Sequence, residues 1–381
     1  MKILFISHDT SHSGAPKSLR LFINWIANNR SDIKCDILLR RGVKLPFLDD
    51  TINTYLYTPP YLERSGSIIN RIAFHSKILL LTKWIHKLLL LCKLKKNNYD
   101  LIYSNTIVNA DVLDFLSSIK CKKIVHAREV DLTYNDFGGE QIISLNNQHA
   151  DKFIAITNAV SNALVRYGVD KTKISVVNNH IELKTTNIKS KYLLRRKYNI
   201  PKEAFLIGGC GNLGNIKGFD VFLQLAAKFR ETKEFYFIWY GMPNKIKKTE
   251  IEYDVIRLNL TDKFIVDSFL PNQSIEYFSI LDCFFFSSKS DGFGLVGLEA
   301  SLNKVPIICF EKAGGQPEFV SQGAGYVVPY MDIDAVYKKI NLLYDNKGLL
   351  KSIGEKGYNI VREKYDIEKV APKLLNTALN D

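Results

Sequence analysis

The sequence predicts an α/β protein with two domains, each built on a parallel β-sheet that helices cover. Three observations support this fold class: a length of 381 residues, short apolar runs that alternate with longer helical patterns, and a restart of that alternation near residue 200. At about 150 residues per domain, the length suits two domains. Repeated strand–helix alternation is typical of parallel sheets with helices on both faces, so two such series predict two Rossmann-like domains.

The first series of strands lies in the N-terminal half. Ile3–Ser7 has the apolar, β-branched character of a strand, and a glycine-containing loop follows it. Helical spacing then runs from Ala15 to Asn28. Four more short apolar runs predict further strands: Cys35–Leu39, Leu101–Ser104, Lys123–His126 and Phe153–Thr157.

The second series follows a polar, basic segment, Lys184–Lys197, and Pro201. Its five predicted strands are Phe205–Gly209, Tyr236–Tyr240, Phe264–Asp267, Cys283–Ser287 and Pro306–Phe310. We therefore expect an N-terminal domain at residues 1–180, a linker at 181–202, a C-terminal domain at 203–365, and a C-terminal helix at 366–381 that can return to the N-terminal domain. In parallel α/β sheets, ligands bind at the carboxyl ends of the strands.

Composition narrows the function classes. Apolar residues make up 46% and charged residues 24%, which excludes disordered and collagen-like chains. The 52 Lys and Arg against 39 Asp and Glu give a net charge of +13, which favours an anionic partner: nucleic acid, a phosphorylated substrate or a membrane surface. Six widely spaced cysteines without a C-x-x-C pair, and an N-terminal apolar run too short for a signal peptide, predict a cytoplasmic protein.

The segment from Ser290 to Ala300 is the most informative part of the sequence. It follows a predicted strand and opens an apolar helical run, with Asp291 and Glu299 eight positions apart. Glycines in the turn allow the backbone to approach a ligand closely, and the first amides of the following helix form an anion site. Glu299, about one turn into that helix, can accept hydrogen bonds from vicinal hydroxyls of a sugar. The alternative is a glycine-rich turn with a buried capping carboxylate.

This segment closely resembles the E-x7-E donor-binding motif of the family-four glycosyltransferases, which are retaining enzymes of the GT-B fold. Asp291 stands where the family has its first glutamate. Six other blocks resemble the family in order along residues 1–365: Ser13–Leu19, Ile124–Glu129, Asp151–Asn158, Ile174–Asn179, Gly211–Gly218 and Gly314–Glu318.

The resemblance implies a nucleotide sugar in a cleft between the two domains. Glu299 would bind the ribose hydroxyls, Asp291 would contact the donor sugar as a catalytic residue, and Lys217 would pair with the diphosphate. Asn212, also expected to bind the donor, stands where the family has its usual arginine, and Ile216 is apolar. The missing arginine removes a bidentate phosphate contact. The resemblance assigns the remaining donor-binding positions to the backbone of Gly292, Phe293, Gly294, Leu295 and Val296.

Four residues of the N-terminal half complete the predicted site. His126 ends a predicted strand, and the resemblance implies that it orients or polarises the donor sugar; a structural hydrogen bond is the alternative. Gly14 would let backbone amides approach the diphosphate, although it can also be a simple turn glycine. Arg128 and Glu129 are expected near the acceptor, or else form an ordinary surface ion pair.

Together these features predict a retaining glycosyltransferase that moves a sugar from a nucleoside-diphosphate sugar to a glycan or lipid-linked oligosaccharide of a bacterial surface polysaccharide. No cofactor and no obligatory metal are expected, and Asp332 or Asp334 is interpreted as a helix N-cap instead of a metal ligand. Two alternatives remain, a GT-B-like sugar-nucleotide epimerase and a basic nucleic-acid-binding protein. The sequence contains no recognised nucleic-acid-binding motif, so we expect no nucleic acid partner.

The region from Arg64 to Lys96 predicts attachment to the inner face of the cytoplasmic membrane. From Arg64 to Tyr99 there are eight Lys and Arg and no acidic residue. On a helix, Lys83, His86, Lys87 and Lys93 lie opposite a broad apolar face made by Leu80, Leu81, Trp84, Ile85, Leu88 and Leu91. Such a helix can lie in the headgroup layer of an anionic membrane. The alternative is a crossover helix that packs its apolar face on the sheet.

Overall fold

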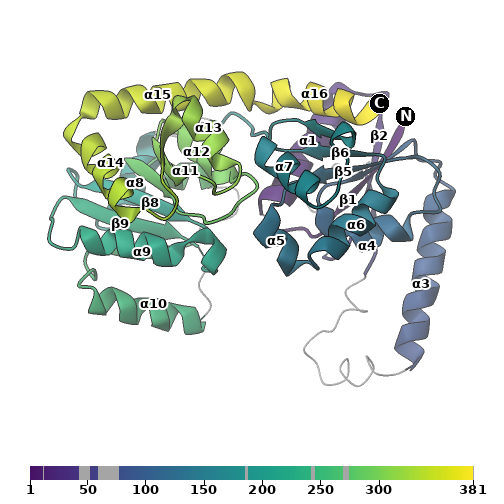
Figure 1. Ribbon diagram of the computed structural model, residues 1–381, viewed down its shortest axis with the longest axis horizontal. Helices are drawn as coiled ribbons and strands as arrows, with labels where there is room; N and C mark the ends of the chain where they lie inside the picture. The colour runs from purple at the N-terminus through teal and green to yellow at the C-terminus, as the bar shows by residue number, and fades with distance from the viewer. Residues whose placement is uncertain are drawn as a thin grey trace. The chain divides into compact units, whose positions relative to one another are not determined.

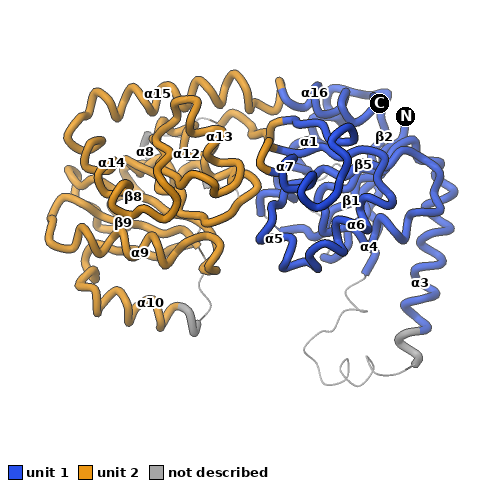
Figure 2. The backbone as a smooth tube through the Cα atoms, in the orientation of Figure 1, with its two compact units in different colours: residues 1–156, 160–177, 370–381 blue, residues 157–159, 178–369 orange. Residues whose placement is uncertain are grey.

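The computed structural model describes residues 1–11, 13–42, 52–58, 77–184, 188–241, 245–268 and 274–380. The chain divides into two compact units, which Figure 2 distinguishes by colour. Unit 1 contains Met1–Ile156, Val160–Val177 and Val370–Asp381, and unit 2 contains Thr157–Ala159 and Asn178–Lys369. Among the described residues, no helix is long and apolar enough to cross a membrane.

Unit 1 is built on a parallel sheet with the strand order β3-β2-β1-β4-β5-β6-β7. Figure 1 labels β1, β2, β5 and β6 of this sheet. Its strands are β1 (Lys2–Ser7), β2 (Lys34–Leu39), β3 (Asn53–Leu56), β4 (Leu101–Ser104), β5 (Lys122–Ala127), β6 (Lys152–Ala155) and β7 (Ile174–Val176). Its helices are α1 (Gly14–Asn29), α3 (Lys77–Lys95), η2 (Ile107–Asn109), α4 (Ala110–Phe115), α5 (Asp131–Asp136), α6 (Glu140–His149), α7 (Asn158–Arg166), η3 (Lys171–Lys173) and most of α16 (Ile367–Leu379).

Unit 2 has a second parallel sheet with the order β10-β9-β8-β11-β12-β13. Its strands are β8 (Phe205–Cys210), β9 (Phe235–Tyr240), β10 (Phe264–Asp267), β11 (Cys283–Phe286), β12 (Ile307–Phe310) and β13 (Gly325–Val328). Its helices are α8 (Ile188–Lys197), η4 (Asn215–Lys217), α9 (Phe219–Lys228), α10 (Lys245–Arg257), α11 (Ser274–Phe278), α12 (Leu295–Leu302), α13 (Gln316–Phe319), the π-helical η5 (Val320–Ala324), α14 (Ile333–Asp345) and α15 (Lys347–Lys364).

The prediction of two parallel α/β domains is confirmed. The central strands are apolar on both faces because helices cover both sides of a parallel sheet. All four residues of β11, for example, are buried. Among the described residues, three short strands were not predicted: β3, β7 and β13. Each is an edge strand of its sheet and has only three or four residues. In β13, one of the four residues is a glycine. None of the three therefore produces a sustained apolar run.

The segment at 181–202, predicted as a linker, is grouped with unit 2 and contains α8. Arg195 of α8 donates hydrogen bonds to the Ile280 carbonyl at 3.0 Å and to the Asp282 carboxylate at 2.6 Å. The basic character of this segment thus includes a side chain that holds the helix against its unit. Residues 370–381 of the predicted C-terminal helix are grouped with unit 1.

Candidate functional site

The loop after β8 brings a lysine to the carboxyl end of the unit 2 sheet. Gly218 has a left-handed backbone (φ +71°), and a Cβ there would clash with the Ser287 carbonyl oxygen, so only glycine fits. A Cβ at Gly211 would lie 2.8 Å from Cγ of Lys217. The two glycines therefore let the loop fold tightly, with Lys217 lying across its start.

The loop after β11 carries Asp291 and is held in place by the glycine turn at Gly314–Gly315. The Asp291 amide donates to the Ala313 carbonyl at 3.0 Å, and the Gly315 amide donates to the Asp291 carbonyl at 3.0 Å. Gly314 has φ +96°, and a Cβ there would clash with the Asp291 carbonyl oxygen. The second turn is therefore a support that fixes the backbone of the first.

Lys217 and Asp291, which lie 74 residues apart in the sequence, form an ion pair. The side chains are 30% and 14% exposed, so both can still be reached from solvent. Burial lowers the pKa of Lys217, but the charge and the hydrogen bond of Asp291 outweigh burial and place this pKa above its ordinary value. Lys217 is thus held charged.

Glu299 belongs to the same cluster. It lies in α12 and is only 3% exposed. Burial, together with the charge of Glu299, raises the pKa of Cys210 at the end of β8, while Lys217 acts in the opposite direction. The carboxylate and the lysine therefore both lie near the end of β8. Because β8 pairs with β11, three predicted donor-binding side chains gather where two neighbouring strands end.

The other predicted donor-binding residues of unit 2 offer their backbone. The Phe293 ring stacks on Tyr365 with centroids 5.6 Å apart, so this side chain is part of the core. Gly294 is the N-cap of α12, and Leu295 and Val296 form its first turn, whose amides have no acceptor within the helix. The Gly292 carbonyl accepts a hydrogen bond from Thr157 Oγ1 at 3.2 Å.

Asn212, in the loop after β8, does not replace the family's arginine as a cation. Its Oδ1 accepts a hydrogen bond from the Gly214 amide at 3.3 Å, which shapes the loop locally. After β13, Asp332 caps α14 by accepting from the Ala335 amide at 2.8 Å, as predicted.

In unit 1, the structure gathers a second cluster around His126 at the end of β5. Tyr103 OH lies 2.5 Å from His126 Nδ1, and Arg128 Nη2 lies 3.2 Å from the same nitrogen. Because a guanidinium only donates hydrogen bonds, Nδ1 must accept. We therefore assign the proton of the neutral imidazole to Nε2. The ring is completely buried.

Arg128 is a buried part of this cluster, which rules out the alternative of an exposed surface ion pair with Glu129. Its Nε donates to the carbonyl oxygen and to Oδ1 of Asn105 at 3.2 and 3.1 Å. Burial lowers the pKa of Arg128, and Tyr103 and Glu129 oppose this shift. The side chain thus joins the ends of β4 and β5.

Glu129 and Gly14 lie around the same strand ends. The Glu129 carboxylate accepts from Thr106 Oγ1 and from the Arg128 amide, the latter at 2.9 Å, next to the start of η2. Gly14 is the first residue of α1, and Asn105 Nδ2 donates to the Ala15 carbonyl at 2.8 Å. The four N-terminal residues of the predicted site are therefore neighbours within unit 1.

Sequence reasoning missed three contributors to these clusters: Tyr103, Asn105 and Cys210. Tyr103 lies inside a correctly predicted strand. Its phenol hydroxyl, which needs a hydrogen-bond partner when buried, was the feature of the sequence that could have pointed to it. Asn105 and Cys210 directly follow or end strands, the place where functional side chains of parallel sheets gather.

Comparison with known proteins finds a family match for the part of the chain that carries Lys217, Asp291 and Glu299. Residues 190–360 match the family described as glycosyl transferases group 1. The O-antigen biosynthesis glycosyltransferase WclY of Escherichia coli is 28% identical over 158 residues, which are 42% of this chain and 42% of that protein. The capsular polysaccharide biosynthesis glycosyltransferase CapM of Staphylococcus aureus is 23% identical over 234 residues, 59% of this chain and 60% of that protein. The chain matches less than two thirds of the length of either relative.

Solved structures extend the likeness to the whole chain. The Anabaena protein Alr3699/HepE, whose crystal structure was determined in complex with UDP and glucose, superposes with a TM-score of 0.80 and 19% identity over 99% of both chains. At this level of identity the likeness establishes the fold. Residues 190–360 are therefore similar to a group 1 glycosyl transferase domain, and the chain has, along its length, the GT-B fold of the family-four glycosyltransferases that its motifs resemble.

Proposed function

We propose that the protein is a glycosyltransferase that moves a sugar from a nucleoside-diphosphate sugar to a glycan or lipid-linked acceptor, with retention of configuration, in the synthesis of a cell-surface polysaccharide. The observation that carries the proposal is the gathering of Lys217, Asp291 and Glu299 at two adjacent strand ends, inside the matched family domain. The names of the relatives, which act in O-antigen and capsular polysaccharide biosynthesis, support the acceptor class.

In this proposal, unit 2 binds the donor. Glu299 accepts hydrogen bonds from the ribose hydroxyls, and the first amides of α12 receive the phosphates. Lys217 exchanges its ion pair with Asp291 for the diphosphate, so that Asp291 becomes available to the hydroxyls of the donor sugar. A charged lysine aimed at the diphosphate stabilises the leaving group as its negative charge develops.

Unit 1 supplies the histidine and the acceptor side. With its proton on Nε2, His126 donates a hydrogen bond to the donor sugar and polarises it, while Tyr103 and Arg128 hold the ring. Glu129 lies on the acceptor side. The acceptor hydroxyl attacks the anomeric carbon from the face that the diphosphate leaves, and the departing phosphate oxygen takes the acceptor proton. No metal or cofactor is part of this proposal.

A thermal-shift panel of nucleotide sugars tests the proposal directly, because a ligand that binds only the folded state raises its stability. At a concentration of about 100 times Kd, the stabilisation amounts to about 2.7 kcal/mol, which several degrees of melting temperature report. We expect one nucleotide sugar to stand out and generic DNA to cause no comparable shift. Product analysis with and without a glycan acceptor then separates transfer from epimerisation, since an epimerase releases a changed sugar nucleotide without any acceptor.

We further propose that the protein attaches to the inner face of the cytoplasmic membrane through α3. Of the region from Arg64 to Lys96, residues 64–76 and the side chains of 77–80 lie outside the described residues. The described part supports the proposal, because Trp84 and Leu89 are 60% and 66% exposed. The six cysteines, all free thiols, suit the reducing cytoplasm.

Vesicle binding checks this attachment. Sedimentation with anionic and with neutral vesicles should show preferential binding to the anionic ones, and Lys83→Glu/Lys87→Glu/Lys93→Glu should lose it. Each lysine near an anionic surface contributes about 1 kcal/mol, so the expected loss exceeds about 100-fold at low salt and shrinks as salt is added. Equal binding of the wild type to both kinds of vesicle would contradict the proposal.

A further inference from the structure

Helix α3 is turned opposite to an ordinary amphipathic helix of a globular protein. In the described part of the helix, five apolar side chains face outward: Leu81 (55%), Trp84 (60%) and Leu89 (66%) are more than half exposed, and Ile85 and Leu88 are also exposed. Its basic side chains Lys83, His86 and Lys87 are only partly exposed and face their own unit. Figure 1 shows this helix at the margin of unit 1. The packing alternative from the sequence, in which the apolar face covers the sheet, is therefore wrong for this part of the helix.

Two leucines explain the orientation. Leu90 and Leu94 are buried, and they lie on the same face as His86 and Lys87 because residues three, four, seven and eight apart share one side of a helix. Anchoring the C-terminal half of α3 through these leucines rotates the preceding turns so that Lys83, His86 and Lys87 point inward.

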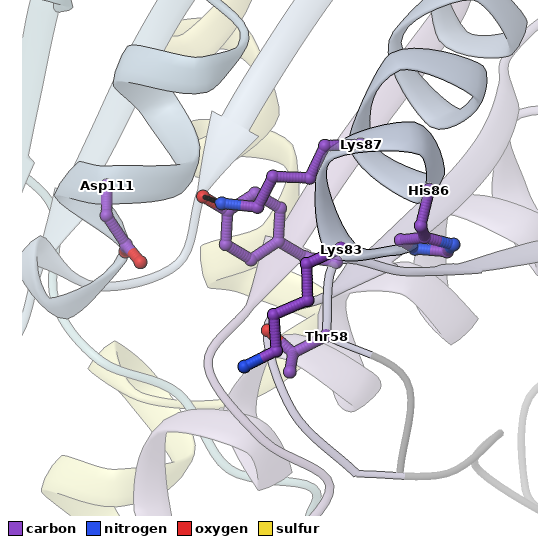
Figure 3. A pocket seen from close by; sticks show the side chains of 6 residues that line it. Thr58, Lys83, His86, Lys87 and Asp111 are labelled. Carbon is purple, nitrogen blue, oxygen red and sulfur yellow. Dashed lines mark hydrogen bonds between the residues drawn. The ribbon is translucent and has the colours of Figure 1, made fainter. Parts of the chain in front are cut away.

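The inward-facing basic residues line a pocket of about 230 Å³. Figure 3 shows the two lysines reaching from α3 toward the segment that follows β3, with a carboxylate from α4 facing them. Of the described residues, Tyr57, Thr58, Lys83, His86, Lys87 and Asp111 line it.

Among the described side chains that line the pocket, there are two lysines and one carboxylate. Asp111, its carboxylate, pairs with Arg40 Nε at 2.9 Å, which neutralises its charge. Lys87 Nζ donates to Tyr57 OH at 2.7 Å and lies 4.2 Å from the centroid of that ring, which leaves further ammonium protons for a ligand. His86 Nε2 lies 2.9 Å from the Leu56 carbonyl oxygen, so this nitrogen carries a proton. Two lysines beside a phenol and a hydroxyl make a site for a small oxyanion.

We propose that this pocket binds the phosphate group of a membrane lipid whose acyl chains lie against the exposed apolar face of α3. The proposal rests on the membrane attachment proposed above and names the chemical group of the lipid that the protein recognises. A lipid fits better than a soluble phosphate because consecutive residues serve both purposes: Lys83 lines the pocket and Trp84 stands on the apolar face. Tryptophan and leucine are the side chains that interfacial helices place at the headgroup boundary.

The position of the pocket has a consequence for orientation. It lies where β3 ends and α4 begins, at the carboxyl edge of the unit 1 sheet, and His126 ends β5 at the same edge. Four strand spacings separate β3 from β5, roughly 19 Å. A lipid phosphate held by Lys83 and Lys87 therefore brings this edge, with its histidine cluster, to the membrane surface.

The test compares two charge-matched variants on three kinds of vesicle: phosphatidylcholine alone, phosphatidylcholine with phosphatidic acid, and phosphatidylcholine with oleic acid. Lys83→Gln/Lys87→Gln removes the pocket lysines, and Lys93→Gln/Lys95→Gln removes two exposed lysines of the same helix. Hydrogen bonds between charged groups contribute more binding free energy than diffuse electrostatic attraction to the surface. We therefore expect the pocket variant to lose about tenfold more affinity for phosphatidic acid vesicles than its control. The wild type should prefer phosphatidic acid to oleic acid vesicles.

Two further measurements complete the test. The fluorescence difference between wild type and Trp84→Phe should shift to the blue when phosphatidic acid vesicles are added, because Trp84 enters an apolar layer. Thr58→Val leaves all charges in place and should weaken binding to the same vesicles. This variant replaces Lys83→Gln/Lys87→Gln in the test if the lysine variant does not fold.

Equal losses in the two lysine variants would leave vesicle attachment standing and overturn the pocket. If glycerol 3-phosphate displaces the protein from vesicles at a concentration equal to that of the lipid phosphate, the pocket binds soluble phosphates. That result would overturn the proposal that it recognises a lipid. A dimer that buries Trp84 in the absence of vesicles would assign the apolar face to a second copy. None of these readouts requires sugar transfer, so they stand apart from the proposed enzyme activity.

Discussion

Glu299→Ala is expected to weaken the binding of UDP about 100-fold while the fold stays intact. A carboxylate that accepts two ribose hydroxyls makes two hydrogen bonds to a charged group, each contributing about 1.5 kcal/mol or more, and every 1.4 kcal/mol is a factor of ten in Kd. Isothermal calorimetry measures the affinity, and thermal unfolding without ligand checks the fold, since Glu299 lies in the buried helix α12. If the thermal-shift panel selects another base, the corresponding diphosphate replaces UDP.

The contact with ribose has its own control. In the wild type, 2′-deoxy-UDP should bind more weakly than UDP, and Glu299→Ala should bind both alike, because the hydroxyl and its acceptor are one interaction. Asp291→Ala is the matched variant from the same loop and helix: it should lower turnover more than UDP affinity, because Asp291 faces the sugar in our proposal. Unchanged UDP affinity in Glu299→Ala would refute the assignment.

The second large effect is expected at His126. Replacing it with alanine should lower kcat about 100-fold and change the Kd of UDP less than about twofold, because a single well-placed hydrogen-bond donor at a reacting centre typically contributes about that much. The histidine belongs to unit 1 and the nucleotide contacts to unit 2 in our proposal, so turnover and nucleotide affinity separate. A variant that transfers sugar at the wild-type rate would show that the histidine is structural.

Tyr103→Phe refines this prediction. The substitution keeps the ring, which packs edge-on against His126, and removes the hydroxyl that lies 2.5 Å from Nδ1. Burial raises the pKa of Tyr103, so the hydroxyl keeps its proton at any working pH. With Arg128 still donating to Nδ1, the ring should keep its tautomer, and we expect a kcat between those of the wild type and His126→Ala. Steady-state kinetics at saturating donor measure the difference.

Most of the fold could be predicted because parallel strands buried on both faces give apolar runs that are easy to recognise. Runs such as Cys283–Ser287 could be predicted as strands without tertiary information. Asn53–Leu56, in contrast, joins the sheet by pairing with β2, and its polar sequence does not predict this pairing. Helix α3 shows the same limit. Its two stripes were visible, but which stripe faces the protein depends on where Leu90 and Leu94 are buried.

The candidate site could also be predicted only in part from the sequence. Residues adjacent to glycines or strand ends, such as Lys217 and Asp291, could be located from the sequence, although their mutual ion pair could not, because 74 residues separate them. The clamp of Tyr103 and Arg128 on one nitrogen of His126 depends on three side-chain directions at the ends of two strands. Spacing alone does not encode such directions.

The placement of the last residues sets an order of events during synthesis. Lys122 of β5 donates to the carbonyl oxygens of Leu379 and Asn380 at 3.2 and 2.9 Å, and Lys152 of β6 reaches Asn380 at 3.2 Å. Leu374 and Leu375 are buried in the same unit. Unit 1 therefore completes its core only when α16 has left the ribosome, whereas the continuous stretch Asn178–Lys369 of unit 2 is available earlier. A nascent chain that stalls before residue 370 is translated carries a finished unit 2 and a unit 1 whose apolar surface is still partly uncovered.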